Sequence, residues 1–319
     1  MTEPLTPSDR SDRVYALAVS PNFNQDGICF AARHSGLYRS EDFGHNWTEA
    51  YAGLKPAEPL STLSVVVSPD FEEDHSVFAG VAGGILRSVD GGQSWNAAFL
   101  PTPPPLVSSL VISPAFARDG VLLAGTADDG VYRTANRGHN WSPWKFGLLD
   151  LNVFCLAISP NFAEDETLYA GAESGLFCST NGGRAWKEID LLTGFEPVLS
   201  LAISPNFAVD ETLFAGTESQ GLLKSTDGGE SWSRLGQTVL RDPSNMIILA
   251  PGYPVNPDVL LLHGGSLLFS RDDGQTWVNC AADLSDSVMC VVAPYGLDSG
   301  ATLVAGLADG RVVSAKLLN

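Results

Sequence analysis

Carboxylates are the most abundant groups in this sequence that could do chemistry. The chain carries 37 Asp and Glu against 18 Lys and Arg, so its formal net charge is -19 at pH 7. Paired carboxylates can act as acid and base on a glycosidic bond, and carboxylate clusters can bind Ca²⁺. The same charge repels nucleic acids and anionic membrane surfaces. We therefore expect neither nucleic-acid binding nor membrane insertion, and a partner that is basic, neutral or cationic.

Cysteine and histidine are too scattered to predict a metal site. The five cysteines, Cys29, Cys155, Cys178, Cys280 and Cys290, contain no C-x-x-C pair, and the five histidines are equally dispersed. We therefore expect no metal and no cofactor. Five widely spaced cysteines without an export signal are typical of a reducing compartment, and no run of 18 apolar residues occurs. These observations predict a cytoplasmic protein.

One pattern recurs seven times, each time as a short apolar segment that ends in Ser-Pro or Ala-Pro. The prolines lie 43 to 48 residues apart, at Pro21, Pro69, Pro114, Pro160, Pro205, Pro251 and Pro294. This period fits one four-stranded blade of a β-propeller. The segments within each repeat are short, β-rich and bounded by Gly, Pro, Asn and Asp, so we expect strands and no helix.

The repeat predicts an all-β chain that forms a single seven-bladed propeller over residues 1–319. The first strands of four-stranded antiparallel blades are expected to start near Val14, Thr62, Val107, Val153, Val198, Ser244 and Ser287. The residues after Pro294 and those up to Pro21 together make one repeat. We therefore expect residues 2–6 to supply the outer strand of blade seven and to close the ring.

A tight hairpin between the third and fourth strands is the most specific local signal. It has the form S/T-x-D/N-x-G-x-x-W, and we call it the box. Its acidic or amide and tryptophan positions are Asp42 and Trp47, Asp90 and Trp95, Asn136 and Trp141, Asn181 and Trp186, Asp227 and Trp232, and Asp272 and Trp277. An Asp or Asn side chain can accept backbone N–H groups in the turn, and Gly supplies positive φ. We expect the box to be structural.

The box resembles the Asp-box, or bacterial neuraminidase repeat. That repeat occurs in sialidases, two-propeller xyloglucanases, sortilin-type receptors and a photosystem II assembly factor. The resemblance covers nearly the whole chain and implies a propeller, but it says little about activity. The chain also differs from members of this group. Sialidases need an arginine cluster for their substrate. They also carry an Arg-Ile-Pro motif, and this chain lacks that motif. The assembly factor is exported and recognises its client through basic residues, so its client does not carry over.

The first strands, which line the channel of a propeller, predict that the chain is not an enzyme. None of the seven contains Asp, Glu, Lys, Arg or His. Paired catalytic carboxylates cannot be built from them. Two other recurring groups have structural interpretations. Cations before the box, at Arg39, Arg87, Arg133 and Lys224, are expected to lie solvated at the blade rim. The Asp of Ser-Pro-Asn-Phe-x-x-Asp either ligates Ca²⁺ or closes a turn.

A binding surface is expected on the face that carries the turns from second to third strand and the connections between blades. Its turns hold Asp128, Asp129, Glu173, Glu218 and Asp309, and its connections hold the aromatic residues Trp144, Phe146, Phe99, Tyr51 and Phe195. Aromatic anchors surrounded by charge are typical of an interaction site. The alternative is that the aromatics pack onto the ring and the acids only solubilise it.

These features predict a non-catalytic scaffold, complex subunit or assembly factor whose partner is another protein. The alternative function is a carbohydrate-binding or glycoside-hydrolase propeller of the sialidase type, with its residues on loops. Aromatic platforms and carboxylates on the same face would then hold a sugar.

Overall fold

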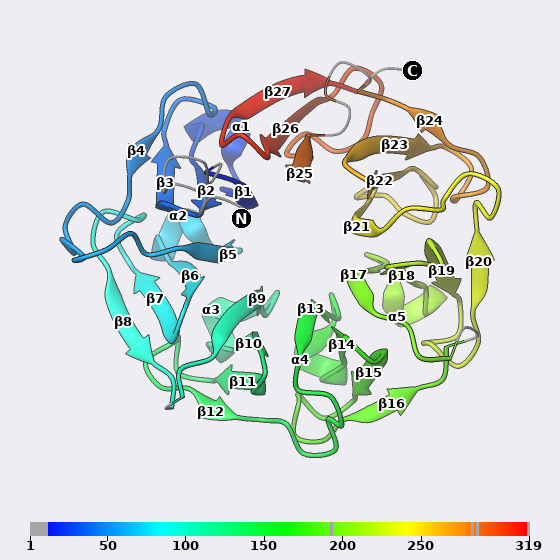
Figure 1. The fold of residues 1–319 in the computed structure, drawn as a ribbon, viewed down its shortest axis with the longest axis horizontal. Helices are drawn as coiled ribbons and strands as arrows, with labels where there is room; N and C mark the ends of the chain where they lie inside the picture. The colour runs from blue at the N-terminus through cyan, green and yellow to red at the C-terminus, as the bar shows by residue number, and fades with distance from the viewer. Residues whose placement is uncertain (1–11, 102, 192–193, 282–283, 285–286, 318–319) are drawn as a thin grey trace, which may run out of the picture.

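The computed structural model describes residues 12–101, 103–191, 194–281, 284 and 287–317. They form seven antiparallel sheets arranged as a ring around a central axis (Figure 1). Six sheets have four strands and the last has three within the described residues. The predicted all-β, seven-bladed propeller is therefore confirmed. The strand that residues 2–6 were expected to add to blade seven lies outside the described residues.

Each blade follows the order of the chain from the centre outward. Blade 1 consists of β1 (Val14–Val19), β2 (Cys29–Arg33), β3 (Gly36–Ser40) and β4 (Thr48–Glu49). Blade 2 consists of β5 (Thr62–Val67), β6 (Val77–Val81), β7 (Gly84–Ser88) and β8 (Asn96–Phe99), and blade 3 of β9 (Leu106–Ile112), β10 (Leu122–Ala127), β11 (Gly130–Thr134) and β12 (Ser142–Pro143). Blade 4 consists of β13 (Val153–Ile158), β14 (Leu168–Ala172), β15 (Leu176–Ser179) and β16 (Lys187–Ile189). Blade 5 consists of β17 (Val198–Ile203), β18 (Leu213–Thr217), β19 (Leu222–Ser225) and β20 (Ser233–Leu235). Blade 6 consists of β21 (Ser244–Leu249), β22 (Val259–His263), β23 (Ser266–Ser270) and β24 (Val278–Asn279). Blade 7 consists of β25 (Val288–Val292), β26 (Thr302–Leu307) and β27 (Val312–Lys316).

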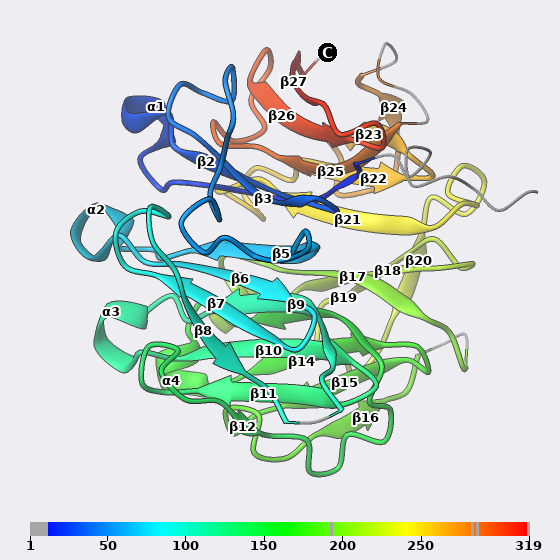
Figure 2. The same cartoon turned by 60° about the vertical axis from the view of Figure 1, so that its left-hand side comes forward.

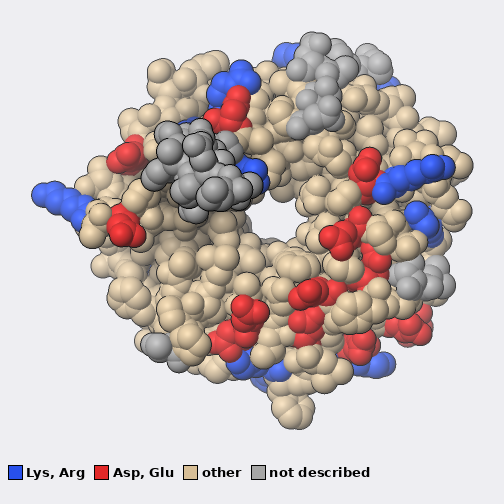
Figure 3. Space-filling model, in the orientation of Figure 1, with Lys and Arg blue, Asp and Glu red and all other residues tan. Residues whose placement is uncertain are grey.

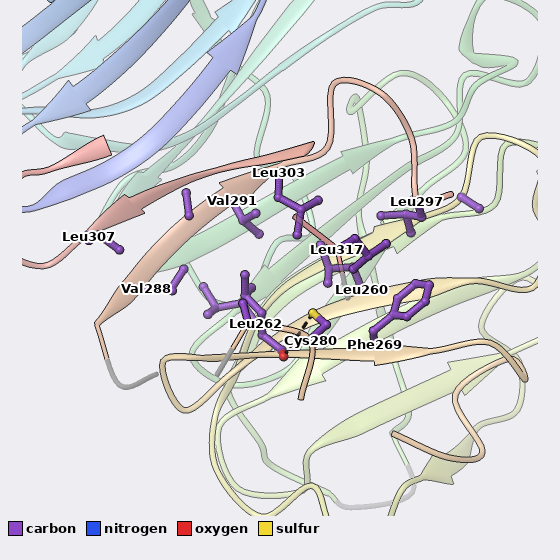
Figure 4. Close-up of a cluster of buried hydrophobic side chains, with 14 residues drawn as sticks. Leu260, Leu262, Phe269, Cys280, Val288, Val291, Leu297, Leu303, Leu307 and Leu317 are labelled. Atoms are coloured by element: carbon purple, nitrogen blue, oxygen red, sulfur yellow. Dashed lines mark hydrogen bonds between the residues drawn. The ribbon is translucent and has the colours of Figure 1, made fainter. Parts of the chain in front are cut away.

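The apolar core lies between neighbouring blades. Figure 4 shows the largest cluster, in which Phe269 and Leu260 of blade 6 face Val291 and Leu303 of blade 7. Blade 7 in turn packs on blade 1, where Val14 and Cys290 are both fully buried. The two ends of the described chain are therefore joined by the same apolar packing that joins the other blades.

Five single-turn helices contradict the expectation that the chain has no helix. They are α1 (Phe23–Asp26), α2 (Phe71–Asp74), α3 (Phe116–Asp119), α4 (Phe162–Asp165) and α5 (Phe207–Asp210), each following a Ser-Pro turn. A single turn is too short for a helical period to show in the sequence. Each final Asp closes the turn. Asp26, for example, accepts Ser20 Oγ at 2.5 Å and Ile28 N at 2.9 Å.

The same bonds decide the two interpretations of this Asp. In the other four turns, the Asp likewise accepts the hydroxyl of the preceding Ser and the backbone N–H two residues onward. Both carboxylate oxygens are thereby used, which is the turn-closing alternative. Across the described ranges, no group of three or more His, Cys, Asp or Glu side chains is placed to hold a metal ion.

The boxes have the expected hydrogen bonds. Asp90 Oδ1 accepts Gln93 N at 3.1 Å and Ser94 N at 2.9 Å, and Gly92 has φ +88°. Trp95 Nε1 donates to Gly92 O within the hairpin and to Ala50 O of the previous blade. The box therefore closes its own hairpin, and its Trp joins neighbouring blades.

The ring has two distinct faces. The box face carries the five short helices and the boxes. Helix and box of one blade are joined by a backbone hydrogen bond, for example from Gly91 N in the blade 2 box to His75 O at the end of α2. Figure 2 shows α1 to α4 along this one side. The loop face carries the turns between second and third strands and the connections between blades, bonded for example by Gly83 N to Pro105 O. The loop face is turned toward the reader in Figures 1 and 3.

Candidate functional site

A groove with a volume of ≈ 680 Å³ lies on the loop face between blades 2 and 3. One wall is the connection from blade 2, and the other is the β10–β11 turn with the chain after β12. The lining residues are Pro101, Pro103, Pro104, Pro105, Leu106, Ala127, Asp128, Asp129, Tyr132, Pro143 and Lys145. The structure thus brings two of the predicted acidic residues, Asp128 and Asp129, to one proline-walled groove.

Asp129 and Asp128 have different roles in this groove. Asp129 is half-buried and is ion-paired with Lys145, and it accepts the hydroxyl of Tyr132. Burial opposes ionisation of Asp129, but the hydrogen bonds from Lys145 and Tyr132 outweigh it and lower its pKa. Asp128 is exposed and holds φ +70°, a conformation that Asp tolerates better than most residues. Asp129 therefore shapes the groove, while Asp128 presents a carboxylate to solvent.

Exposed aromatic side chains occur on the chain segments next to the lining residues and on the next connections. Phe99 at the end of β8 is 85% exposed and lies two residues before Pro101 of the groove. Phe146 is 80% exposed and follows the lining residue Lys145. Phe195, on the connection from blade 4 to blade 5, is 76% exposed. Leu149, 78% exposed near Phe146, belongs with these residues but was not among those predicted from the sequence.

Two predicted aromatic anchors are corrected by their packing. Tyr51 is only 5% exposed, and its hydroxyl lies 3.2 Å from Thr62 Oγ1. Trp144 is half-buried, with Arg133 4.2 Å and Arg184 5.3 Å from its ring. These contacts commit Tyr51 to the core and Trp144 to the boundary between blades 3 and 4. Neither side chain projects as a free anchor.

The remaining predicted acids lie on other blades. Glu173 and Glu218 are exposed on the turns of blades 4 and 5, and Glu173 accepts Asn152 Nδ2 at 2.9 Å. Asp309, on blade 7, is paired with Arg311. Figure 3 shows acidic residues in an arc beside the central opening, over blades 3 to 6. The structure therefore gathers Asp128, Glu173 and Glu218 on one face without bringing them into a single cluster.

A set of acids that was not predicted from the sequence precedes the first strands. Glu196 is 6% exposed and accepts Ser219 N at 2.6 Å and Ser219 Oγ at 2.9 Å. Asp150 accepts Ser174 N at 2.6 Å, and Asp12 accepts Ser35 N at 2.8 Å. The signal was available, because each acid lies two or three residues before a first strand. These acids bind the backbone of the loop-face turns and so connect the turns to the residues that precede the first strands.

The seven first strands offer no side chain for acid–base chemistry. They contain no Asp, Glu, Lys, Arg or His. An opening at the centre of the ring is visible in Figure 3, with acidic residues along part of its rim. Among the described residues, no helix is both long and apolar enough to span a bilayer.

No protein-family model and no curated protein matches this sequence. Solved structures share its fold. The GH74 xyloglucanase from Xanthomonas campestris is 16% identical, with a TM-score of 0.73 over 97% of this chain and 52% of that one. The extracellular domain of a one-component system from B. thetaiotaomicron is 14% identical, with a TM-score of 0.70 over 96% and 38%. The structure of YCF48 bound to D1 peptide is 18% identical, with a TM-score of 0.70 over 98% and 93%.

The chain therefore spans about half or less of the first two structures and nearly all of the third. These neighbours include a xyloglucanase, the extracellular domain of a one-component system and a protein with a bound peptide. At identities of 14% to 18% they show the fold alone, which is a seven-bladed β-propeller.

Proposed function

We propose that this chain is a non-catalytic protein-interaction propeller, acting as a complex subunit or assembly factor, that binds its partner through the loop face. The observation that carries the proposal is the groove between blades 2 and 3, where the exposed carboxylate of Asp128 lies in a proline-walled groove and the exposed Phe99 precedes the lining residue Pro101 by two residues. Proline residues restrict the backbone of such a wall, and an apolar wall with one exposed charge can bind a partner side chain with less loss of conformational entropy.

The partner segment is an extended stretch of protein that carries apolar side chains and a Lys or Arg. The net charge of -19 and the acidic arc of Figure 3 attract a basic segment. Glu173 and Glu218 extend this attraction along the face. The D1 peptide bound by YCF48 supports the proposal as a precedent, because that ring matches this one over nearly its whole length.

Carbohydrate binding is the alternative. Aromatic rings beside carboxylates also fit sugars, and the xyloglucanase has the same fold. The uncharged first strands favour a protein partner over a hydrolysed sugar, because paired carboxylates on the two sides of a glycosidic bond are required for hydrolysis. The free thiols of all five cysteines support a further proposal, that the protein works in the reducing cytoplasm.

Affinity capture with paired variants tests the proposal. Phe99→Ser with Asp128→Lys alters the groove, and Val209→Ser with Asp70→Lys makes the same kind of change on the box face, where Val209 is 78% exposed and Asp70 is exposed. We expect a partner that the wild type and the control retain and the groove variant loses. Retention by both variants would refute the loop-face site. A glycan-array signal lost only in the groove variant would instead support the carbohydrate alternative.

A further inference from the structure

The cations that precede the boxes lie in the gaps between blades. The expectation that they lie solvated at the blade rim is therefore wrong. All four, Arg39, Arg87, Arg133 and Lys224, are half-buried on the third strands β3, β7, β11 and β19. A charge in such a gap needs a counter-charge or hydrogen bonds. Arg39 is 2.7 Å from Glu41 Oε1, and Lys224 is ion-paired with Asp273. Arg133 lies over the Trp144 ring.

The gap between blades 5 and 6 shows the complete arrangement. Phe214 of blade 5 and Tyr253 of blade 6 meet edge to face at 5.9 Å, and Lys224 lies 5.5 Å from the Phe214 ring. Asp273, the fourth residue of the blade 6 box with φ +63°, accepts Tyr253 Oη at 2.7 Å. The acid thus neutralises the lysine from across the gap.

The gap between blades 2 and 3 repeats this arrangement with one charge reversed. Phe78 and Phe116 meet edge to face at 5.7 Å, and Arg87 occupies the position of Lys224. The fourth residue of the blade 3 box is Arg137, again with positive φ, at 58°. Arg137 therefore stands where the equivalent gap has the neutralising acid. Its guanidinium lies 5.6 Å from the Phe116 ring, and its Nη2 donates to Ala117 O.

Arg87 consequently has no counter-charge of its own. Among the described residues, no carboxylate lies within 4.0 Å of its guanidinium, and its buried Nε has no hydrogen-bond partner. Burial lowers the pKa of Arg87, and repulsion from Arg137 lowers it further. Asp74 attracts Arg87 from a greater distance, but its oxygens are bonded to Ser68 Oγ and Ser76 N.

We propose that the gap between blades 2 and 3 on the box face is a binding site for a phosphate group, held between the guanidinium groups of Arg87 and Arg137. Two guanidinium groups match the charge of a phosphate dianion and offer donors to several of its oxygens. The bound group would replace the carboxylate that Asp273 supplies in the gap between blades 5 and 6. This site is independent of the loop face and of the proposed function.

Thermal unfolding in inorganic phosphate tests the site, with chloride replaced so that ionic strength stays constant. We expect a saturable rise of the midpoint, about 2 to 4 °C at ten times the dissociation constant. Acetate, a monoanion, is the second arm and should give a clearly smaller rise. An equal response to acetate, or none to phosphate, would overturn the assignment.

Arg137→Asp is the decisive variant because it restores the arrangement of Lys224 and Asp273. We expect it to unfold at a higher temperature than the wild type in phosphate-free buffer and to lose the phosphate response. Arg87→Gln should bind phosphate at least about tenfold more weakly. Arg311→Gln, which alters a 70% exposed arginine elsewhere, is the control and should respond as the wild type does. A phosphate response that persists in Arg137→Asp contradicts the proposal.

Discussion

A methyl group added at Gly125 tests how closely the blades approach one another. Gly125 lies in β10 of blade 3, and β13 of blade 4 packs directly against it. A Cβ at this position would lie 2.8 Å from Val153 Cγ1 and 3.5 Å from Leu156 Cδ1. Val153 is fully buried and cannot move into solvent. Gly125→Ala should therefore force the two blades apart or push Val153 out of its rotamer.

The expected destabilisation follows from two opposing effects. Overpacking a well-packed core costs about 1 to 3 kcal/mol. Replacing Gly by Ala restricts the unfolded chain and returns about 0.4 to 1 kcal/mol. We therefore expect Gly125→Ala to lower the free energy of unfolding by about 1 to 2 kcal/mol. Gly53→Ala is the matched control, because nothing lies within 4 Å of its Cβ position and its φ is not positive. It should be neutral or slightly stabilising.

Denaturant unfolding followed by tryptophan fluorescence measures both variants, since six of the seven tryptophans lie in boxes. The double variant Gly125→Ala with Val153→Ala removes the methyl that the new Cβ meets. Its loss of stability should be smaller than the sum of the two single losses, by about 1 kcal/mol. Equal stability of Gly125→Ala and Gly53→Ala, or additive losses in the double variant, would refute the close packing of blades 3 and 4.

Two further predictions concern pH. Hydrogen bonds from Asn46 and Ser40 hold the pKa of Asp42 at about 2, and those from Ser231 and Ser225 do the same for Asp227. Because the pKa is lower in the folded state, the contribution of Asp42 to the free energy of unfolding is complete above about pH 4 and is lost as the pH falls toward 2. Asp42→Asn should therefore flatten the acid limb of a stability–pH curve. An unchanged slope would contradict this. His263 Nε2 accepts the N–H groups of Arg241 and Asp242, both at 3.1 Å, and burial lowers its pKa despite the opposing effect of Asp242. Only the neutral ring can accept these two hydrogen bonds. The denaturation midpoint of the wild type should therefore decrease as the pH is lowered from 7 to 5, and that of His263→Gln should decrease less. Parallel curves would show that the ring does not titrate in this way.

The ring could be predicted from the sequence because its signals are local and repeated. A box needs only eight consecutive residues, and the period between prolines sets the number of blades. Whether a side chain on a connection is exposed depends on where that connection crosses the neighbouring blade. Tyr51 and Phe99 look alike in the sequence, yet one is 5% and the other 85% exposed. The groove and the gap that contains Arg87 likewise form between blades, so no single repeat reveals them.

A photo-cross-linking amino acid at position 99 tests the proposed interaction most directly. The same residue at position 209, on the box face, serves as the control, because both native side chains are highly exposed. In native cells we expect a protein adduct from position 99 that Asp128→Lys diminishes, and no such adduct from position 209. Equal adducts from both positions, or a position-99 adduct that Asp128→Lys leaves unchanged, would contradict a partner bound at the loop-face groove.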